Sequence, residues 1–165
     1  LFLVTVRDFL KTKIQNFSQN LSHFGFSLLI LSILFNNIFS SEIITNLKVG
    51  ETFKNEKFEI EFRNLKKFEK QNYISYKGYF LIKENQTKEK LEPELRVYNQ
   101  PNIITSEADI KTTFLSDKFI TINTVQNEEY FNVRYLVKPF MLWIWISVIL
   151  ISLGGTISLF KRKSL

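Results

Sequence analysis

The chain has 165 residues, no cysteine, one histidine and a formal net charge of +6 at pH 7. Without cysteine it has no disulfide, no thiolate metal site and no nucleophilic thiol, and a single histidine cannot supply an HExxH zinc motif. The charge does not indicate a nucleic-acid partner. Most of it flanks two apolar stretches, while the charges between these stretches nearly balance and form no basic stripe.

Residues 1–20 are predicted to be a cytoplasmic segment, in which Arg7, Lys11 and Lys13 are set against Asp8. The chain opens on Leu1 rather than Met, which indicates a fragment or a processed product. The apolar first residues are expected either to end a preceding transmembrane helix or to begin an amphipathic helix on the inner membrane surface. The amphipathic helix is suggested by apolar residues that recur at spacings of three and four, namely Leu3, Val6, Leu10, Ile14, Phe17 and Leu21.

Residues 21–39 are predicted to form the first transmembrane helix, although His23, Asn36 and Asn37 make this stretch less apolar than the second one. A signal peptide is the alternative interpretation, because a basic flank precedes the stretch and small residues follow it. The length of the stretch favours a true span.

Residues 140–160 are predicted to form the second transmembrane helix, because this stretch carries no charge. At about 1.5 Å per residue it reaches about 30 Å, the thickness of the hydrocarbon core. Trp143 and Trp145 are expected to lie at the membrane–water interface. The basic tail 161–165 and the basic first flank place both termini in the cytoplasm, by the positive-inside rule, and export residues 40–139.

Residues 40–139 are predicted to form one small β domain. Lys57–Arg63 alternates Phe58, Ile60 and Phe62 with charged residues, the period-2 pattern of a half-buried strand. Further strands are expected at 73–83, 119–125 and 130–138, where aromatic and β-branched residues gather, with turns at 55–56, 84–86 and 126–128. The pattern indicates a sandwich or open barrel of about six strands.

One short helix is predicted over Ser106–Asp117, with Ser106 as its N-cap and Asp109 three residues further on. The expected fold class is therefore membrane α plus β: two transmembrane helices flank an exported, mostly antiparallel β domain with one short helix. The acidic residues of this domain are expected on a solvated surface rather than as catalytic pairs: Glu92, Glu94, Glu128 and Glu129. No catalytic residue is assigned.

His23 is the candidate binding residue, because ionisable side chains inside a span are rare and usually have a partner. Helical spacing places Ser27, Ile30 and Leu34 on its face and turns Gly25 away. Two interpretations stay open. His23 is either an imidazole among lipid headgroups or an axial ligand of a membrane haem, whose second ligand would come from outside this chain.

Four parts of the chain resemble the CcmF/NrfE family, the haem-lyase subunits of the cytochrome c maturation system. LEPELRVYNQPNIITSEADIKTTFL (91–115) is similar to the family's "RPEKR-Y…TTEAAI" segment, and YLVKPFMLWIWISVILISLGGTISLFK (135–161) to its closing "YYKPFVRWIWLGGLLMALGGLLAL". LSHFGFSLLILS (21–32) resembles the span "AHLGLALLVLG", and Gly50-Glu51 matches the "PGE" turn. The chain departs from the family at Glu94 and Met141, where basic residues are common.

The resemblance implies that this chain is the C-terminal part of a haem-lyase subunit that supports covalent haem attachment to apocytochrome c. His23 would ligate a membrane haem b, the only metal contact expected. The implied partners are the rest of the subunit, the haem chaperone, apocytochrome c and other maturation proteins, with no nucleic acid. The implied location is the bacterial inner membrane with the β domain in the periplasm, or alternatively the mitochondrial inner membrane.

The family's tryptophan-rich WWD loop is absent from this sequence, so the chain alone is not expected to be catalytic. The alternative function is a non-catalytic two-span membrane anchor that presents its β domain to another protein. In that case His23 would lie at the membrane interface without binding haem.

Overall fold

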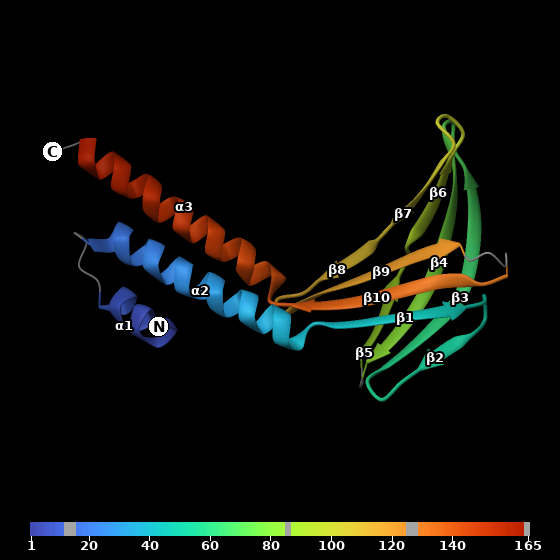
Figure 1. Cartoon of the computed structure of the whole chain (residues 1–165), viewed down its shortest axis with the longest axis horizontal. Helices are drawn as coiled ribbons and strands as arrows, with labels where there is room; N and C mark the ends of the chain where they lie inside the picture. Colours follow the sequence, from blue (N-terminus) through green and yellow to red (C-terminus); the bar gives the residue numbers. More distant parts are fainter. Residues whose placement is uncertain (12–15, 85–86, 125–128, 164–165) are drawn as a thin grey trace. The chain divides into compact units, whose positions relative to one another are not determined.

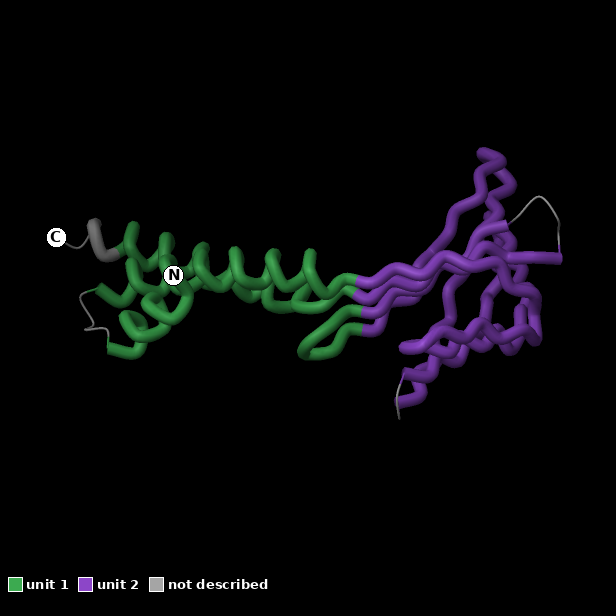
Figure 2. The backbone as a smooth tube through the Cα atoms, turned by 60° about the horizontal axis from the view of Figure 1, so that its bottom comes forward, with its two compact units in different colours: residues 1–40, 112–117, 138–165 green, residues 41–111, 118–137 purple. Residues whose placement is uncertain are grey.

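The computed structural model describes residues 1–165 apart from 12–15, 85–86, 125–128 and 164–165. It divides into two compact units, coloured separately in Figure 2. One unit holds residues 1–40, 112–117 and 138–165, and the other holds 41–111 and 118–137. Each unit is described in turn.

The first unit contains three helices, α1 (Phe2–Leu10), α2 (Phe17–Phe39) and α3 (Met141–Lys163) (Figure 1). Both α2 and the Met141–Phe160 part of α3 are long and apolar enough to cross a membrane, with mean hydropathies of 1.5 and 2.0. Only 28% and 11% of their most apolar windows are buried, so most of their apolar surface is uncovered. Such surface suits a lipid environment better than water.

Small residues bring α2 and α3 close together. A Cβ atom added to Gly25 would lie 3.0 Å from the backbone nitrogen of Ile151, and one added to Gly154 would lie 2.7 Å from the carbonyl oxygen of Ser18. The Ser22 hydroxyl donates a weak hydrogen bond to the Ile151 carbonyl at 3.4 Å. Small residues at a helix contact let backbones approach, as is common between transmembrane helices.

The short helix α1 packs on α2 through aromatic side chains and polar contacts. The rings of Phe9 and Phe24 stack with centroids 5.2 Å apart, and the hydroxyl oxygens of Thr5 and Ser27 lie 2.6 Å apart. The stripe expected to run from Leu3 to Leu21 on a single helix is interrupted, since α1 ends at Leu10 and α2 begins at Phe17. Leu3 and Leu10 are exposed rather than packed on α2.

The second unit is a β-sandwich, and ten strands occur among the described residues. Their order is four strands, β1-β10-β9-β8, in one sheet, and β2-β3-β4-β6-β7 in the other, where β5 also pairs with β4. The strands are β1 (Ser41–Leu47), β2 (Thr52–Lys54), β3 (Phe58–Glu69), β4 (Tyr73–Glu84), β5 (Thr87–Leu91), β6 (Glu94–Tyr98), β7 (Ile103–Glu107), β8 (Asp109–Thr112), β9 (Ser116–Thr124) and β10 (Phe131–Pro139). The pairs β1/β10, β3/β4 and β6/β7 are antiparallel.

Side chains from both sheets form one apolar core. The rings of Phe62 and Phe80 stack with centroids 4.3 Å apart, and Ile120, Ile122 and Val133 of the other sheet are fully buried against them. The predicted alternation is confirmed, because Phe58, Ile60 and Phe62 all lie in this core. The large aromatic area holds together a domain that has no disulfide.

Four predicted strands correspond to observed ones: 57–63 to β3, 73–83 to β4, 119–125 to β9 and 130–138 to β10. The expected total of about six strands was too low. The turn at 55–56 is confirmed, since the Asn55 carboxamide oxygen accepts hydrogen bonds from the backbone N–H groups of Lys57 and Phe58. Residues 85–86 and the turn expected at 126–128 lie outside the described residues.

The helix predicted over Ser106–Asp117 is wrong, because this segment contains the end of β7, all of β8 and the start of β9. Neither expected capping residue caps a helix. The Ser106 hydroxyl donates to the Ile122 carbonyl at 2.7 Å, and the Asp109 carboxylate accepts from the Glu92 backbone N–H at 2.6 Å. Long-range partners in the sandwich therefore use the groups that local spacing assigned to a helix start.

Candidate functional site

His23 projects from the side of α2 that does not face α3. Its side chain is exposed, whereas Gly25, two residues further along, packs against Ile151 of α3. This is the arrangement expected from helical spacing, because two residues correspond to about 200° around the axis. Ser27 differs in burial from the other residues on this face. It shares a face with His23 but is buried beside Thr5, while Ile30 and Leu34 are exposed.

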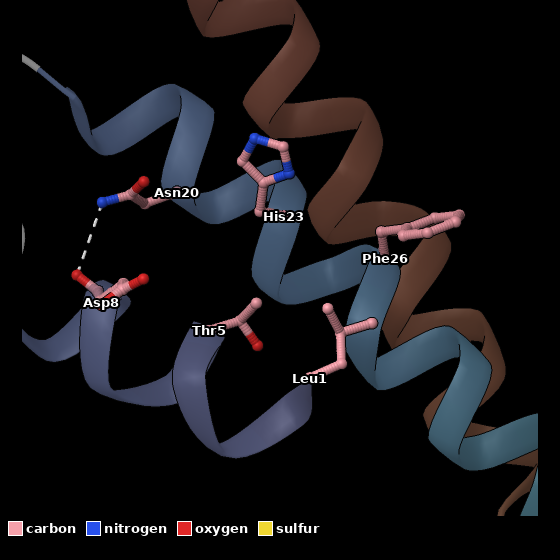
Figure 3. Close-up of a pocket in the computed structure, with 6 residues that line it drawn as sticks. All are labelled: Leu1, Thr5, Asp8, Asn20, His23 and Phe26. Atoms are coloured by element: carbon pink, nitrogen blue, oxygen red, sulfur yellow. Dashed lines mark hydrogen bonds between the residues drawn. The ribbon is translucent and has the colours of Figure 1, made fainter.

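His23 borders an open cavity of about 380 Å³ between α1 and α2, shown in Figure 3. Asn20 donates a weak hydrogen bond of 3.4 Å to the backbone carbonyl of Asp8, which joins the two helices. The cavity is lined by Leu1, Thr5 and Asp8 from α1 and by Asn20, His23 and Phe26 from α2. Its lining is thus apolar at one side and polar at the other.

The imidazole has no hydrogen-bond or ion-pair partner within the part of the chain that the structure describes. Exposed Phe26 lies one turn further along α2, and exposed Ile30 one turn beyond it. A free imidazole beside apolar side chains fits one face of a haem, which needs one axial nitrogen and apolar contacts for its ring. The described residues contain no cluster of three His, Asp, Glu or Cys that could hold a bare metal ion.

The β unit contains a buried ionic cluster that the sequence analysis missed. Lys118 Nζ lies 2.6 Å from Glu84 Oε2 and 3.2 Å from Glu89 Oε2, and the Lys118 side chain is only 9% exposed. Burial alone would lower the pKa of Lys118, but the two carboxylates raise it above its usual value. The burial of Lys118 could have been predicted from the strand pattern, because Lys118 points to the same face of β9 as the buried Ile120 and Ile122.

The carboxylates considered in the sequence are mostly paired with cations. Glu92 lies 2.9 Å from Lys77, Glu94 lies 3.1 Å from Arg96, and Glu129 lies 2.5 Å from Lys48, while Glu128 lies outside the described residues. A polar hollow of about 300 Å³ contains two of these pairs and is lined by Lys77, Glu92, Glu94, Arg96, Glu107, Ala108 and Asp109. Ion pairs on a β surface account for these groups without a catalytic role.

These features define a class of protein in which a β-sandwich lies in sequence between two helices long and apolar enough to cross a membrane. Residues 38–139 match the model of the CcmF C-terminal beta-sandwich, and the chain belongs to this family. The resemblance seen in the sequence is thereby confirmed.

Named relatives extend the similarity over nearly the whole chain. Cytochrome c-type biogenesis protein CcmF of Haemophilus influenzae is 28% identical over 163 residues, which are 98% of this chain and 25% of that protein. The Escherichia coli CcmF is 25% identical over 93% of this chain and 24% of its own length. Cytochrome c-type biogenesis protein ccl1 of Rhodobacter capsulatus is 40% identical over 44% of this chain and 11% of its own length.

A solved structure has the same fold. The chain described as Cytochrome c Heme Lyase CcmF superposes with a TM-score of 0.69 at 16% identity, covering 93% of this chain and 27% of that one. The present chain thus spans about a quarter of the length of the relatives that it matches over most of its own length.

Proposed function

We propose that this chain is the C-terminal part of a cytochrome c maturation protein, in which it supports covalent haem attachment to apocytochrome c. The observation that carries the proposal is the family match over residues 38–139, accompanied by similarity to cytochrome c-type biogenesis proteins over 98% of the chain. The chain accounts for about a quarter of such a protein, so the attachment reaction belongs to the complete assembly.

His23 is proposed as one axial ligand of a haem b held in the membrane. An imidazole without a polar partner among the described residues, on a helix with exposed apolar neighbours, has the chemistry that this role requires. When bound, the haem would carry electrons that keep iron reduced. The chain's own contribution is to fix the imidazole on α2. The second ligand would come from another polypeptide or another part of the protein, because His23 is the single histidine in this sequence.

The β-sandwich is proposed to be exported and to serve as a docking module for the haem chaperone, apocytochrome c or other maturation proteins. The basic flanks of the two apolar helices favour this orientation. The proposed location is the bacterial inner membrane with the sandwich in the periplasm, with the mitochondrial inner membrane as the alternative.

The ligand assignment is tested by a reduced-minus-oxidised absorption spectrum of the full assembly purified from membranes. We expect His23→Ala to lose the b-type signal. Leu34→Ala, another truncation of an exposed α2 side chain, should retain it. A spectrum that His23→Ala leaves unchanged would contradict the assignment and favour the two-span anchor, whose protein partner would then be sought by crosslinking.

A further inference from the structure

The turn that joins β8 to β9 presents two large apolar side chains. Phe114 and Leu115 are 62% and 60% exposed. The turn is closed by hydrogen bonds between its flanking residues: the Thr113 N–H donates to the Ser116 carbonyl at 2.9 Å, and the Ser116 N–H donates to the Thr113 hydroxyl at 3.1 Å. The two apolar side chains are therefore carried at the tip of an ordered turn.

This tip is bonded to the beginning of α3, with which it shares a compact unit. The indole N–H of Trp143 donates to the Phe114 carbonyl at 3.0 Å, and the two rings meet edge to face with centroids 4.8 Å apart. The backbone N–H of Phe140 donates to the Leu115 carbonyl at 2.8 Å. Three contacts thus fix the tip beside the first turn of the apolar helix.

In the sequence, the tip and α3 each belong to an uncharged run that is bordered by charged residues. Residues 112–116 and 139–160 contain no charge, and the nearest charged residues are Lys111, Asp117 and Lys138. Trp143 lies five residues after Lys138, near the start of the second uncharged run. Tryptophan is enriched at the boundary between headgroups and acyl chains. At the neighbouring end of α2, where the Asn36 carboxamide donates to the Pro139 carbonyl at 2.6 Å, Ile38 and Phe39 are also exposed.

We propose that the Phe114–Leu115 tip inserts into the membrane interface beside α3 and is a third point of contact between this chain and lipid. The partner is the bilayer surface itself. The tip contacts α3 through Trp143, and both the tip and α3 expose apolar side chains. Two large apolar side chains at an ordered turn favour transfer out of water. The inference rests on α3 crossing the membrane, as proposed above.

The absence of cysteine allows a direct test, because each introduced cysteine can be labelled alone. The full chain would be reconstituted into vesicles of phosphatidylcholine and phosphatidylglycerol, with the environment-sensitive fluorophore NBD at Leu115→Cys or Phe114→Cys. Leu153→Cys, on the exposed face of α3, reports whether this helix lies in lipid. Gln71→Cys, in the exposed turn between β3 and β4, reports a water-exposed turn.

We expect the labels at 114 and 115 to emit at shorter wavelength than the label at 71. Lipids carrying a nitroxide near the headgroup should quench them several-fold more strongly than they quench the label at 71, and lipids carrying a nitroxide deep in the acyl chain should quench the label at 153. If 153 is quenched by lipid but 114 and 115 behave like 71, the tip proposal is overturned while the span stands. A blue shift without lipid quenching would mean that protein covers the tip, which also overturns it. If 153 is not quenched either, both the span and the tip proposal fail.

Discussion

Tyr135 has a hydroxyl group that lies inside the β-sandwich without a hydrogen-bond partner among the described residues. A buried unsatisfied hydroxyl costs about 1–3 kcal/mol. We therefore expect Tyr135→Phe to raise the free energy of unfolding by about 1 kcal/mol, since the ring remains in the core. Tyr76→Phe, a less buried change of the same kind, should have little effect. Urea denaturation followed by circular dichroism measures both variants, and a destabilised Tyr135→Phe would contradict this account.

The buried hydroxyl of Tyr135 also leads us to expect that the β domain loses stability at alkaline pH. Burial, and then the negative charges of Glu84 and Glu89, raises the pKa of Tyr135 well above its usual value. Above about pH 10 the unfolded chain loses the phenolic proton while the folded chain retains it, so stability falls as the pH rises. We expect Tyr135→Phe to lessen this fall in a series of thermal melts between neutral and alkaline pH. An unchanged slope would show that other groups cause it.

Replacing Lys118 is expected to lower the stability of the β domain, whereas Tyr135→Phe is expected to raise it. The change Lys118→Met would leave Glu89, only 13% exposed, with the more distant Lys111 at 4.0 Å as its remaining cation. Breaking a buried ion pair on one side costs about 3–5 kcal/mol, whereas an exposed pair is worth about 0–1 kcal/mol. Lys67→Met, which breaks the exposed pair with Glu69, is the matched control. Equal melting temperatures for the two variants would refute a structural role for the Lys118 cluster.

Helical spacing correctly placed His23 and Gly25 on different sides of α2, but it did not predict the surroundings of His23. The burial of Ser27 depends on Thr5 in α1, a separate helix whose packing no periodicity within α2 reveals. The buried position of Lys118 was visible as alternation with Ile120 and Ile122, yet its two carboxylate partners come from β4 and β5. Contacts between segments that are distant in the chain cannot be predicted from the periodicity of a single sequence.

At the scale of secondary-structure elements, long periodic segments were predictable and short strands were not. Phe58, Ile60 and Phe62 alternate strongly enough to mark β3, and the uncharged run marks α3. The four residues of β8 are too few to show a period of two. In that segment the spacing of Ser106 and Asp109 suggested a helix, whereas β7 pairs with β6 and both side chains bond to distant backbone groups. Local preference was overruled by pairing across the sandwich.

The contact between α2 and α3 depends on one of two adjacent glycines. A Cβ atom at Gly154 would lie 2.7 Å from the Ser18 carbonyl oxygen and 2.8 Å from the Ser22 nitrogen, while one at Gly155 would meet nothing within 4 Å. Because the close atoms belong to backbone, α2 would have to move. We expect Gly154→Ala to destabilise the helix pair by about 1–3 kcal/mol and Gly155→Ala to leave it unchanged. Thermal unfolding in detergent compares the two, and equal stability would show that α2 and α3 pack differently.

For the whole molecule, the order of its parts was predictable because membrane helices and sheet strands obey different periods. Two apolar stretches without β alternation bracket a segment that alternates, and the observed elements follow the same order. The number of strands was underestimated because several strands have a solvated face and polar composition, among them Thr87–Leu91. Hydrophobic period is a weak signal for such edge strands.

The whole chain is also the scale at which catalysis has to be judged. The chain holds one histidine and spans about a quarter of its relatives. We propose that it contributes one ligand to a haem site that the complete protein forms. We expect the chain alone, reconstituted in lipid with haem and reduced apocytochrome c, to form no covalent haem product above the level obtained without protein. The complete CcmF of a relative is the positive control, and mass spectrometry of the apocytochrome reads the product. Formation of thioether-linked haem by the isolated chain would contradict the proposal that haem attachment requires the complete protein. Absence of product from the chain, together with a b-type spectrum that appears only when the remaining part of the protein is added, would place His23 as one half of a shared site.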